Sequence, residues 1–441
     1  MLNSPHTPNS SAFPPSASGQ NSARTPEEHF AAVLDLVLSS AHLRVHERDV
    51  DDSIVGLVLA EDVRAQIPLP PFSNSAMDGF LICTSSLDSG PGPWTLSVVG
   101  DVPAGGSTLK PSPGQAVRIM TGGPVPEEHS ALCVVPVELT TTPPGPQPLP
   151  QQVTITEHPH RHHIRSRGEH IAQGQLIANA GELVDAGTLA ALLSAGVSRV
   201  SVYMRPRVGL ISTGAELSKS AHEDFNATPE FGTRIPDSNG PMLSALARRA
   251  GAEVIPALHS SDSPTEFAAA LDSLAENCDL IVTTGGVSAG AFDVVHETLG
   301  QNQSAWFGHV THKPGAPQGH ATWKNTPVIC LPGNPVAAFL SFHLYVSRAL
   351  AALAGHPRPT SPWQRPYLNA AVNATAFPTA APAKTTLIPV HLDFRKDIPV
   401  ATPFSPGRVG SHLVASLSGT QGFAAINAGG EIPDTLRIYL F

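Results

Sequence analysis

The chain has 441 residues, of which 41% are hydrophobic, a formal net charge of −10, and 44 prolines and 37 glycines. A chain of this length forms roughly two to four domains, and so many prolines and glycines exclude a purely helical bundle. Proteins that bind the nucleic-acid backbone carry clustered Lys and Arg, and a membrane span needs about 20 consecutive apolar residues. The sequence has neither feature, so we expect neither nucleic acid nor membrane as a partner.

The N-terminal part combines a polar tail with one helix. Residues 1–24 are rich in Ser, Pro and Asn, which predicts a disordered tail. Thr25 has the character of a helix N-cap, with Pro26 at the first helical position and Glu28 three residues after the cap. Apolar residues at helical spacing follow, so we predict an amphipathic helix. The N-terminal sequence has no basic segment followed by an apolar stretch, so we predict no signal peptide there.

The next part of the chain has the pattern of β-structure. Between residues 68 and 138, short apolar runs are broken by Gly, Pro and Ser. A Pro-rich linker or hairpin loop is expected at 140–150. A helix is expected at Ala186–Ala195, with Gly196 directly after its end.

From Arg207 onward the pattern changes to strands that alternate with helices, which predicts a parallel, doubly wound α/β sheet. The expected strands are 208–212, 252–258, 280–284 and 328–331, and the expected helices are 241–250, 264–275, 292–299 and 335–353. After His356 the Pro-rich composition returns and β-like segments follow, which indicates a small separate domain.

The four cysteines are Cys83, Cys133, Cys278 and Cys330. They are scattered, never form a CxxC pair, and have apolar neighbours. We therefore predict buried free thiols in a reducing cytoplasm and no disulfide or zinc site.

Four segments at expected strand ends carry the residues of a ligand site, because open α/β sheets bind ligands at the carboxyl ends of their strands. They are ISTGAEL, with Ser212, Thr213, Gly214 and Glu216; TTGGVSAGAFD, with Gly285, Gly286, Ser288 and Asp293; HKPGAPQG, with Lys313; and ICLPGNPV, with Pro332, Gly333, Asn334 and Pro335. Glycine lets backbone N–H groups approach a ligand, and a following helix N-terminus favours an anion. We predict a cradle for a phosphate or a pterin. An ordinary strand-to-helix turn is the alternative for each segment alone.

Three further polar residues stand in Gly- and Ser-rich turns. Considered by themselves, Asp78 and Thr121 are turn residues, and Asp237 is a helix N-cap before Pro241. The crowded histidines at 158–163 predict a solvated loop, because no second cluster supports a metal site.

Together these segments resemble the MoeA family, which includes the E domain of gephyrin. The matching stretches are PPFSNSAMDGF, AVRIMTGGPVP, IRSRGEH, LISTGAEL, TRIPDSNG, TTGGVSAGAFD, HKPGAPQG and LPGNPVAAFLSF, in the order of the family. Each alone is a weak signal, but SAMDG, MTGxPVP, GGVSxG and LPGNPV in one chain are highly specific. The resemblance covers essentially everything after the N-terminal tail.

The resemblance implies a multidomain α/β protein. The expected parts are a helix at 25–46 that packs on the α/β domain, a small mixed connecting domain at 47–71 and 160–202, a β-rich domain at 72–159, a molybdopterin-binding α/β domain at 203–354, and a C-terminal β domain at 355–441. The α/β domain is expected to be similar to molybdopterin adenylyltransferase.

The resemblance also implies a cytoplasmic homodimer that acts as a molybdopterin molybdenumtransferase. Such an enzyme takes molybdopterin adenylate and molybdate, uses a divalent cation such as Mg²⁺, and yields molybdenum cofactor and AMP. Its cleft is expected between the α/β and C-terminal domains of one chain and the β-rich domain of the other. Molybdopterin adenylyltransferase and apo-molybdoenzymes are the implied protein partners.

The family's site residues carry over to named positions. Asp78, Glu216 and Asp293 match carboxylates implicated in metal or molybdate handling, which suits the oxygen ligands that Mg²⁺ prefers. Lys313 matches a lysine that contacts a phosphate or oxyanion, and Thr121 matches a hydroxyl that places the substrate. The strand-end residues named above, together with Asp237, are expected to bind the pterin substrate.

The chain departs from the family pattern at three places. His170 replaces a carboxylate, Ala316 replaces a second lysine in the KPG loop, and His391 stands where an arginine often precedes the LDF stretch. These departures bear on anion affinity and on the choice between molybdate and tungstate.

Two other functions compete with this interpretation. The α/β region resembles molybdopterin adenylyltransferase, but the SAMDG-containing β domain and the C-terminal region argue against that activity. A non-catalytic scaffold like gephyrin is the second alternative, and the three intact carboxylates argue against it.

Overall fold

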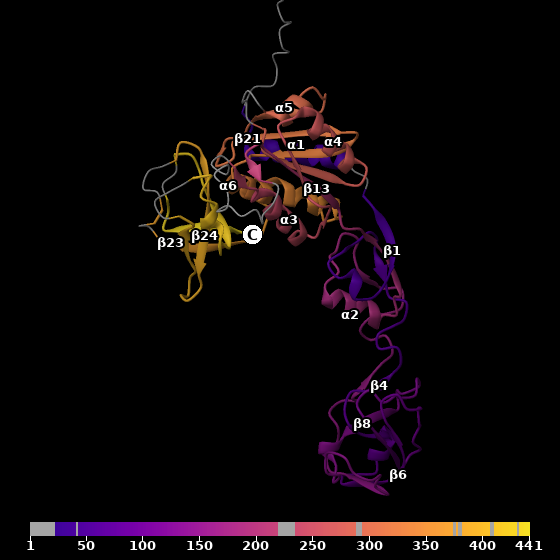
Figure 1. Cartoon of the computed structure of the whole chain (residues 1–441). Coiled ribbons are helices and arrows are strands. Elements are labelled where there is room, and N and C mark those ends of the chain that lie inside the picture. The colour runs from indigo at the N-terminus through magenta and orange to yellow at the C-terminus, as the bar shows by residue number, and fades with distance from the viewer. Residues whose placement is uncertain are drawn as a thin grey trace, which may run out of the picture. The chain divides into compact units, whose positions relative to one another are not determined.

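The chain divides into two compact units in the computed structural model (Figure 1). One unit is formed by Met1–Arg44 together with Tyr203–Phe441, and the other by Val45–Val202. The structure describes residues 23–40, 43–218, 234–287, 293–373, 376–377, 382–405, 410–429 and 432–441. Most of the predicted tail lies outside these residues, but Arg24 forms a β-bridge with Val310.

The first unit is built on a seven-stranded sheet of order β16-β13-β18-β22-β21-β19, with β17 paired to β13. Its strands are β13 (Arg207–Thr213), β16 (Glu253–Val254), β17 (Leu258–Ser260), β18 (Leu280–Thr284), β19 (Trp306–His309), β21 (Pro317–Trp323) and β22 (Thr326–Leu331). Five of these strands run parallel to one another: β13, β16, β17, β18 and β22. Strands β21 and β19 add an antiparallel edge that the sequence pattern did not predict.

The strand expected at 252–258 is wrong as a single element. The structure has two short strands there, β16 and β17, on either side of Pro256. Proline has no N–H to donate to a neighbouring strand, so it interrupts the ladder.

Helices cover both faces of this sheet. They are α1 (Pro26–Ser40), α3 (Asn239–Arg249), α4 (Pro264–Ala275), α5 (Val294–Leu299), α6 (Pro335–Ser341) and α7 (Ser347–Leu353). Residues of α1, α3 and α7 share one core with Leu280 and Val282 of β18, whereas α4 and α5 share the other core with Ile281. Alternate strand residues point to opposite faces, so the doubly wound arrangement follows from the continuous apolar strand.

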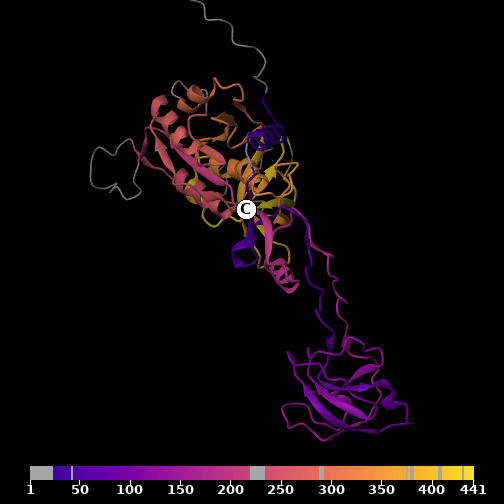
Figure 2. The ribbon, with the colours of Figure 1, turned by 90° about the vertical axis from the view of Figure 1, so that its right-hand side faces the viewer.

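The N-terminal helix is confirmed, together with its predicted capping box, but it ends at Ser40 and not at residue 46, because strand β1 (Val45–Asp49) already includes that residue. Thr25 N donates to Glu28 Oε2 over 2.8 Å, and Glu28 N donates to Thr25 Oγ1 over 3.1 Å. Val33 and Val37 then enter the core that α1 shares with the sheet and α7. Figure 2 shows α1 in indigo against the orange part of the same unit.

The apolar stretch expected as one helix at 335–353 is a helix with an interruption. Helices α6 and α7 are joined by a π-helical turn, Phe342–Val346. By length and composition this stretch could cross a membrane, but 78% of its most apolar window is buried inside the unit. It is therefore a core helix with two apolar sides, one for each neighbouring sheet.

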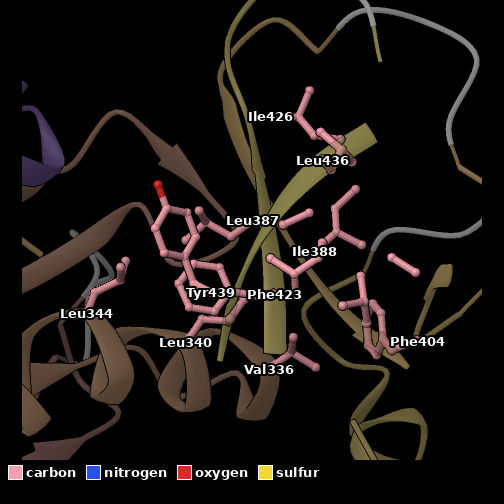
Figure 3. Close-up of a cluster of buried hydrophobic side chains, with 14 of the residues drawn as sticks. Val336, Leu340, Leu344, Leu387, Ile388, Phe404, Phe423, Ile426, Leu436 and Tyr439 are labelled. Carbon is pink, nitrogen blue, oxygen red and sulfur yellow. The ribbon is translucent and has the colours of Figure 1, made fainter. Parts of the chain in front are cut away.

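A second sheet of the first unit packs on that helix. Its order is β20-β24-β25-β23-β27-β26, and an additional pairing of β26 with β24 closes five of the strands into a barrel. The strands are β20 (His312–Lys313), β23 (Tyr367–Val372), β24 (Thr385–Asp393), β25 (Val400–Pro403), β26 (Gly422–Ile426) and β27 (Thr435–Leu440). Figure 3 shows Val336 and Leu340 beside Phe423 of this sheet, and Leu344 and Leu387 belong to the same cluster of buried side chains. One apolar core thus joins the C-terminal strands to α6.

The smaller elements of the first unit are a parallel pair, β14 (Leu217–Ser218) with β15 (Ile235–Pro236), and a 3₁₀ turn at Val414–Leu417.

The second unit contains a five-stranded sheet of order β8-β5-β7-β6-β9. Its strands are β5 (Gly79–Cys83), β6 (Trp94–Val102), β7 (Gln115–Ile119), β8 (Leu132–Pro136) and β9 (Gln152–Ile155). The remaining elements of this unit and its boundary are β1 (Val45–Asp49), β2 (Val58–Leu59), β3 (Val63–Arg64), β4 (Asn74–Ser75), β10 (Ile164–Arg165), β11 (Leu176–Ala178), β12 (Arg199–Tyr203), α2 (Ala186–Ser194) and 3₁₀ turns at Asp52–Ile54, Thr84–Leu87 and Val137–Leu139. Asp185 caps α2. Gly196 follows the helix with φ +74°, as the sequence predicted.

Candidate functional site

A cavity of about 1020 Å³ lies in the first unit, at the carboxyl ends of β13, β18 and β22. Residues Gly410–His412 and Val414 of the C-terminal part form another side of it. Twelve of the predicted site residues line this cavity: Thr213, Gly214, Glu216, Asp237, Gly285, Gly286, Asp293, Lys313, Pro332, Gly333, Asn334 and Pro335. The packing of parallel strands therefore brings together segments that are far apart in the sequence.

The strand-end turns approach one another closely because they carry glycine. Gly285 has φ +97°, and a Cβ atom there would lie 2.6 Å from Thr213 O. A Cβ atom on Gly333 would lie 3.3 Å from Gly285 Cα. Any larger residue at Gly285 would push the β13 and β18 turns apart and change the cavity wall.

A buried amide ties these turns to helix α3. Asn239 Nδ2 donates to Thr284 Oγ1 over 3.0 Å and to Gly333 O over 2.7 Å, and Thr284 Oγ1 donates to Pro332 O over 3.0 Å. Asn239 itself lines the cavity. The sequence pattern did not identify Asn239, because the helix was expected to begin at Pro241 and Asn239 then lay before it. In the structure α3 begins at Asn239.

Of the residues that the structure describes, four carboxylates line the cavity: Glu216, Asp237, Asp262 and Asp293. Asp237 Oδ1 accepts hydrogen bonds from Asn239 N and Gly240 N, each over 3.0 Å, so it satisfies the first N–H groups of α3, although Ser238 occupies the N-cap position that was expected for Asp237. Asp262 Oδ2 accepts from Ala215 N over 3.2 Å. Sequence reasoning missed Asp262, whose sole signal was its place in a polar turn after β17.

Asp293 lies at the N-cap position of α5, but its side chain makes no capping hydrogen bond to that helix. The carboxylate lines the cavity instead. Its place at the start of α5 is therefore not explained by a capping hydrogen bond.

Positive charge is scarce on this wall. Among the described residues that line the cavity, Lys313 is the single Lys or Arg, and His412 is the single histidine. Lys313 is exposed and lies in β20, which pairs with β24 of the C-terminal sheet. Among the described residues of this wall, glycine turns are thus combined with an excess of carboxylates over cationic side chains.

The chain is similar to known proteins in sequence and in fold. Residues 24–196 match the family described as the MoeA N-terminal region (domain I and II), and residues 209–352 match the probable molybdopterin binding domain. The molybdopterin molybdenumtransferase 2 of Mycobacterium tuberculosis H37Rv is 36% identical over 360 residues, which cover 80% of this chain and 85% of the relative. The chain belongs to the MoeA family of molybdopterin molybdenumtransferases.

One further relative agrees with this assignment, and one solved structure shows the same fold. The molybdopterin molybdenumtransferase of Haemophilus influenzae is 32% identical over 311 residues, which cover 70% of this chain and 72% of the relative. The structure of the molybdopterin biosynthesis moeA protein from Pyrococcus horikoshii OT3 matches with a TM-score of 0.73 at 22% identity, and covers 95% of this chain and all of that one. The expected fold class is confirmed.

Not every residue predicted from the MoeA motifs lies on the cavity wall. Ser212 is 1% exposed, and its Oγ has no hydrogen-bond partner. It alternates with Thr213 along β13 and faces Gly240 beneath the start of α3, so the structure places it under the cavity. Ser288 lies outside the described residues.

The MoeA motif residues Asp78 and Thr121 belong to the second unit. Thr121 N donates to Asp78 Oδ1 over 2.6 Å, which joins the SAMDG and MTGGPVP turns. Asp78 lines a separate cavity of about 460 Å³ with Arg118 and Asp101. Arg118 donates to both Asp101 carboxylate oxygens, over 3.0 and 2.5 Å, and these bonds lower the pKa of Asp101.

No three His, Cys, Asp or Glu side chains come together as a metal site within the described parts of the chain. Of the predicted metal ligands, Glu216 and Asp293 line the same cavity, and Asp78 lies in the other unit. In the histidine-rich stretch, His162 Nδ1 bonds to Leu132 O. Ala316, the site of one departure from the family, lines the cavity, whereas His170 is exposed in the second unit.

Proposed function

We propose that the chain acts as a molybdopterin molybdenumtransferase, inserting molybdate into adenylated molybdopterin and releasing AMP. The proposal rests on one observation above all. The MoeA motifs of the α/β domain meet in a single cavity, where glycine turns, four carboxylates and Lys313 form the wall. This cavity suits a large polar substrate that carries phosphates.

Electrostatics of the cavity explain why such a reaction needs an added cation. The adenylate carries a pyrophosphate, and molybdate is a second dianion. Two anions repel one another and repel the carboxylates of the wall, and Lys313 supplies one positive charge. Backbone N–H groups of the turns at Gly285 and Gly333 add partial positive charge.

The donor set fits a divalent cation that is completed by the substrate. Mg²⁺ is usually held by one or two carboxylates together with phosphates and waters, and it rarely has an all-protein cage. Glu216 and Asp293 would hold it, and the lack of a three-ligand cluster among the described residues agrees with such an open site. When bound, Mg²⁺ neutralises charge on the phosphates and the oxyanion.

The chain's own residues would then orient the reactants. Lys313 binds an oxyanion as a point charge, and the strand-end glycine turns hold the adenylate. Asn239 fixes the turns at Thr284 and Gly333 relative to each other by donating a hydrogen bond to each. Thr121 and Asp78, held together in one turn pair, position the substrate from the β-rich domain.

We infer a homodimer in which Asp78 of the partner subunit completes each site. This inference comes from the family resemblance, which pairs the α/β cleft of one chain with the β-rich domain of the other. A cytoplasmic location, supply by a molybdopterin adenylyltransferase and hand-over to apo-molybdoenzymes are proposed on the same ground.

The activity is tested by incubating the purified chain with molybdopterin adenylate, molybdate and Mg²⁺ and measuring AMP by chromatography. We expect AMP release that depends on molybdate. Consumption of ATP with free molybdopterin would instead show an adenylyltransferase. Absence of both reactions, in a protein that melts cooperatively, would favour a scaffold.

Introducing a second lysine into the KPG loop should tighten molybdate binding. Ala316→Lys adds a positive charge to the cavity wall close to Lys313. A partly exposed charge interaction contributes about 1 kcal/mol, so the molybdate Kd should fall roughly fivefold. Calorimetric titration at low salt measures this change, which should shrink as salt is raised.

Gln303→Lys is the matched control for Ala316→Lys, because it adds the same charge at an exposed position outside the cavity lining. An unchanged or higher Kd in Ala316→Lys, or an equal gain in Gln303→Lys, would show that position 316 does not face the anion.

A further inference from the structure

The KPG loop, Lys313–Gly315, forms a hydrogen bond with the buried side chain of His312, which precedes it. His312 Nδ1 lies 2.9 Å from Pro314 O, and His312 Nε2 lies 2.9 Å from Tyr345 Oη. A carbonyl oxygen can only accept, so Nδ1 carries the proton, and the Nε2 of the neutral ring accepts from the tyrosine hydroxyl. Both rings are fully buried. This pair of bonds fixes the tautomer and the direction of the His312 ring.

A second buried side chain holds the same loop one residue further on. Gln318 Nε2 donates to Gly315 O over 2.7 Å and to Ser341 Oγ over 2.6 Å. Gly315 has φ +89°, and a Cβ atom there would lie 3.1 Å from Ser341 Oγ. The loop therefore rests closely on helix α6, and its two successive carbonyl oxygens each accept from a buried side chain.

We call the His312–Tyr345 pair and the Gln318–Ser341 pair the two arms of this loop. Both arms end on one helix. Ser341 is the last residue of α6, and Tyr345 lies in the π-helical turn Phe342–Val346 that follows. Single π-helical turns occur frequently at functional sites, where they redirect side chains. Here the turn presents the Tyr345 hydroxyl to His312 while Leu344 stays in the core shared with the C-terminal sheet.

The arms are uncharged and lie apart from the ligand space. Burial lowers the pKa of His312 to about 4, and burial raises the pKa of Tyr345 well above its usual value. Lys313, Pro314 and Gly315 line the cavity, whereas His312 and Tyr345 do not. The arms can therefore affect a bound anion only through the loop.

We propose that His312–Tyr345 and Gln318–Ser341 form a two-armed clamp that positions Lys313 for its oxyanion. These are positioning residues of the site, and the proposal rests on the function proposed above. Loss of one arm lets the loop move, which displaces the Lys313 ammonium from the oxyanion that it binds and so weakens binding of that anion.

Tyr345→Phe tests the clamp, because it removes one hydroxyl and preserves the ring. We expect the KM for molybdate to rise about 10-fold, with a change in kcat of less than about threefold, since a misplaced lysine weakens anion binding first. Tyr439→Phe is the matched control: it removes a hydroxyl from a buried tyrosine of the same apolar core, away from the loop. Its KM should stay at the wild-type value.

A double-variant cycle separates positioning from general destabilisation. In a Lys313→Ala background, Tyr345→Phe should add no further rise in KM, because residues that act through one another are not additive. Additive effects, or equal effects of Tyr345→Phe and Tyr439→Phe, would overturn the clamp. If Tyr345→Phe melts early, Ser341→Ala removes the anchor of the other arm and should give the same non-additive rise.

A readout without turnover distinguishes failure of the clamp from failure of the proposed function. The lysines stand at 110, 219, 313, 324, 384 and 396, so ¹³C-dimethylation yields few NMR signals, and Lys313→Arg identifies the one from Lys313. Methylation keeps the charge. Tyr345→Phe should shift that signal and Tyr439→Phe should not. A Lys313 signal indifferent to Tyr345→Phe overturns the clamp, whereas a shift in a protein that releases no AMP supports the clamp and refutes the function.

Discussion

Replacing Asp293 by asparagine is expected to slow AMP release about 10²–10³-fold while the protein folds normally. Asparagine preserves the shape of the side chain but removes the negative charge that would hold a cation against the pyrophosphate. A lost metal-assisted charge interaction of roughly 3–4 kcal/mol corresponds to this factor at about 1.4 kcal/mol per decade. AMP release from molybdopterin adenylate measures the rate, and thermal melting run alongside measures folding.

The matched control is a carboxylate that does cap a helix. Asp185 Oδ1 accepts from Thr188 N over 2.8 Å at the start of α2, and asparagine caps about as well as aspartate. Asp185→Asn should therefore change neither rate nor melting. If Asp293→Asn also turns over at the wild-type rate, Asp293 acts as a structural residue at the start of α5, and the proposed cation site loses its main ligand.

Two inactive variants are expected to restore one another in a mixed dimer. Asp78→Asn should lose activity in the same way, and the asparagine Oδ1 can still accept from Thr121 N, so the turn pair should persist. In a heterodimer of Asp78→Asn with Asp293→Asn, one of the two composite sites has both wild-type carboxylates and the other has neither. The co-purified heterodimer should therefore recover about half of the wild-type rate if the site is shared between chains.

Differently tagged subunits, co-expressed and purified through both tags, give the heterodimer for this measurement. Light scattering checks its mass, and each homodimeric variant is the control. If every site is built from one chain alone, the heterodimer contains no intact site and stays as slow as its parents. A monomer with full activity at micromolar concentration would also exclude a shared site.

Much of the α/β domain could be predicted because its signals act over a few residues. Helix α4 begins at Pro264 and ends at Ala275, and β18 spans Leu280–Thr284, as expected. A proline at the first helical turn and a short apolar run between polar residues carry their meaning locally. The motifs at the strand ends likewise predicted eleven of the residues that line the cavity, since each motif is contiguous in the sequence, and Asp237 is the twelfth predicted residue on its wall.

The sequence by itself thus determined the family, the alternation of strands with helices and the segments that supply the site. The tertiary structure alone decided which additional residues join it: Asp262, Asn239 and His412 arrive from three separate segments. It also directed Ser212 beneath α3, and placed within the apolar stretch 335–353 a π-helical turn whose Tyr345 hydroxyl bonds to His312. Local propensity reaches across a turn or two, whereas these contacts depend on packing between elements far apart in the chain, which no short pattern encodes.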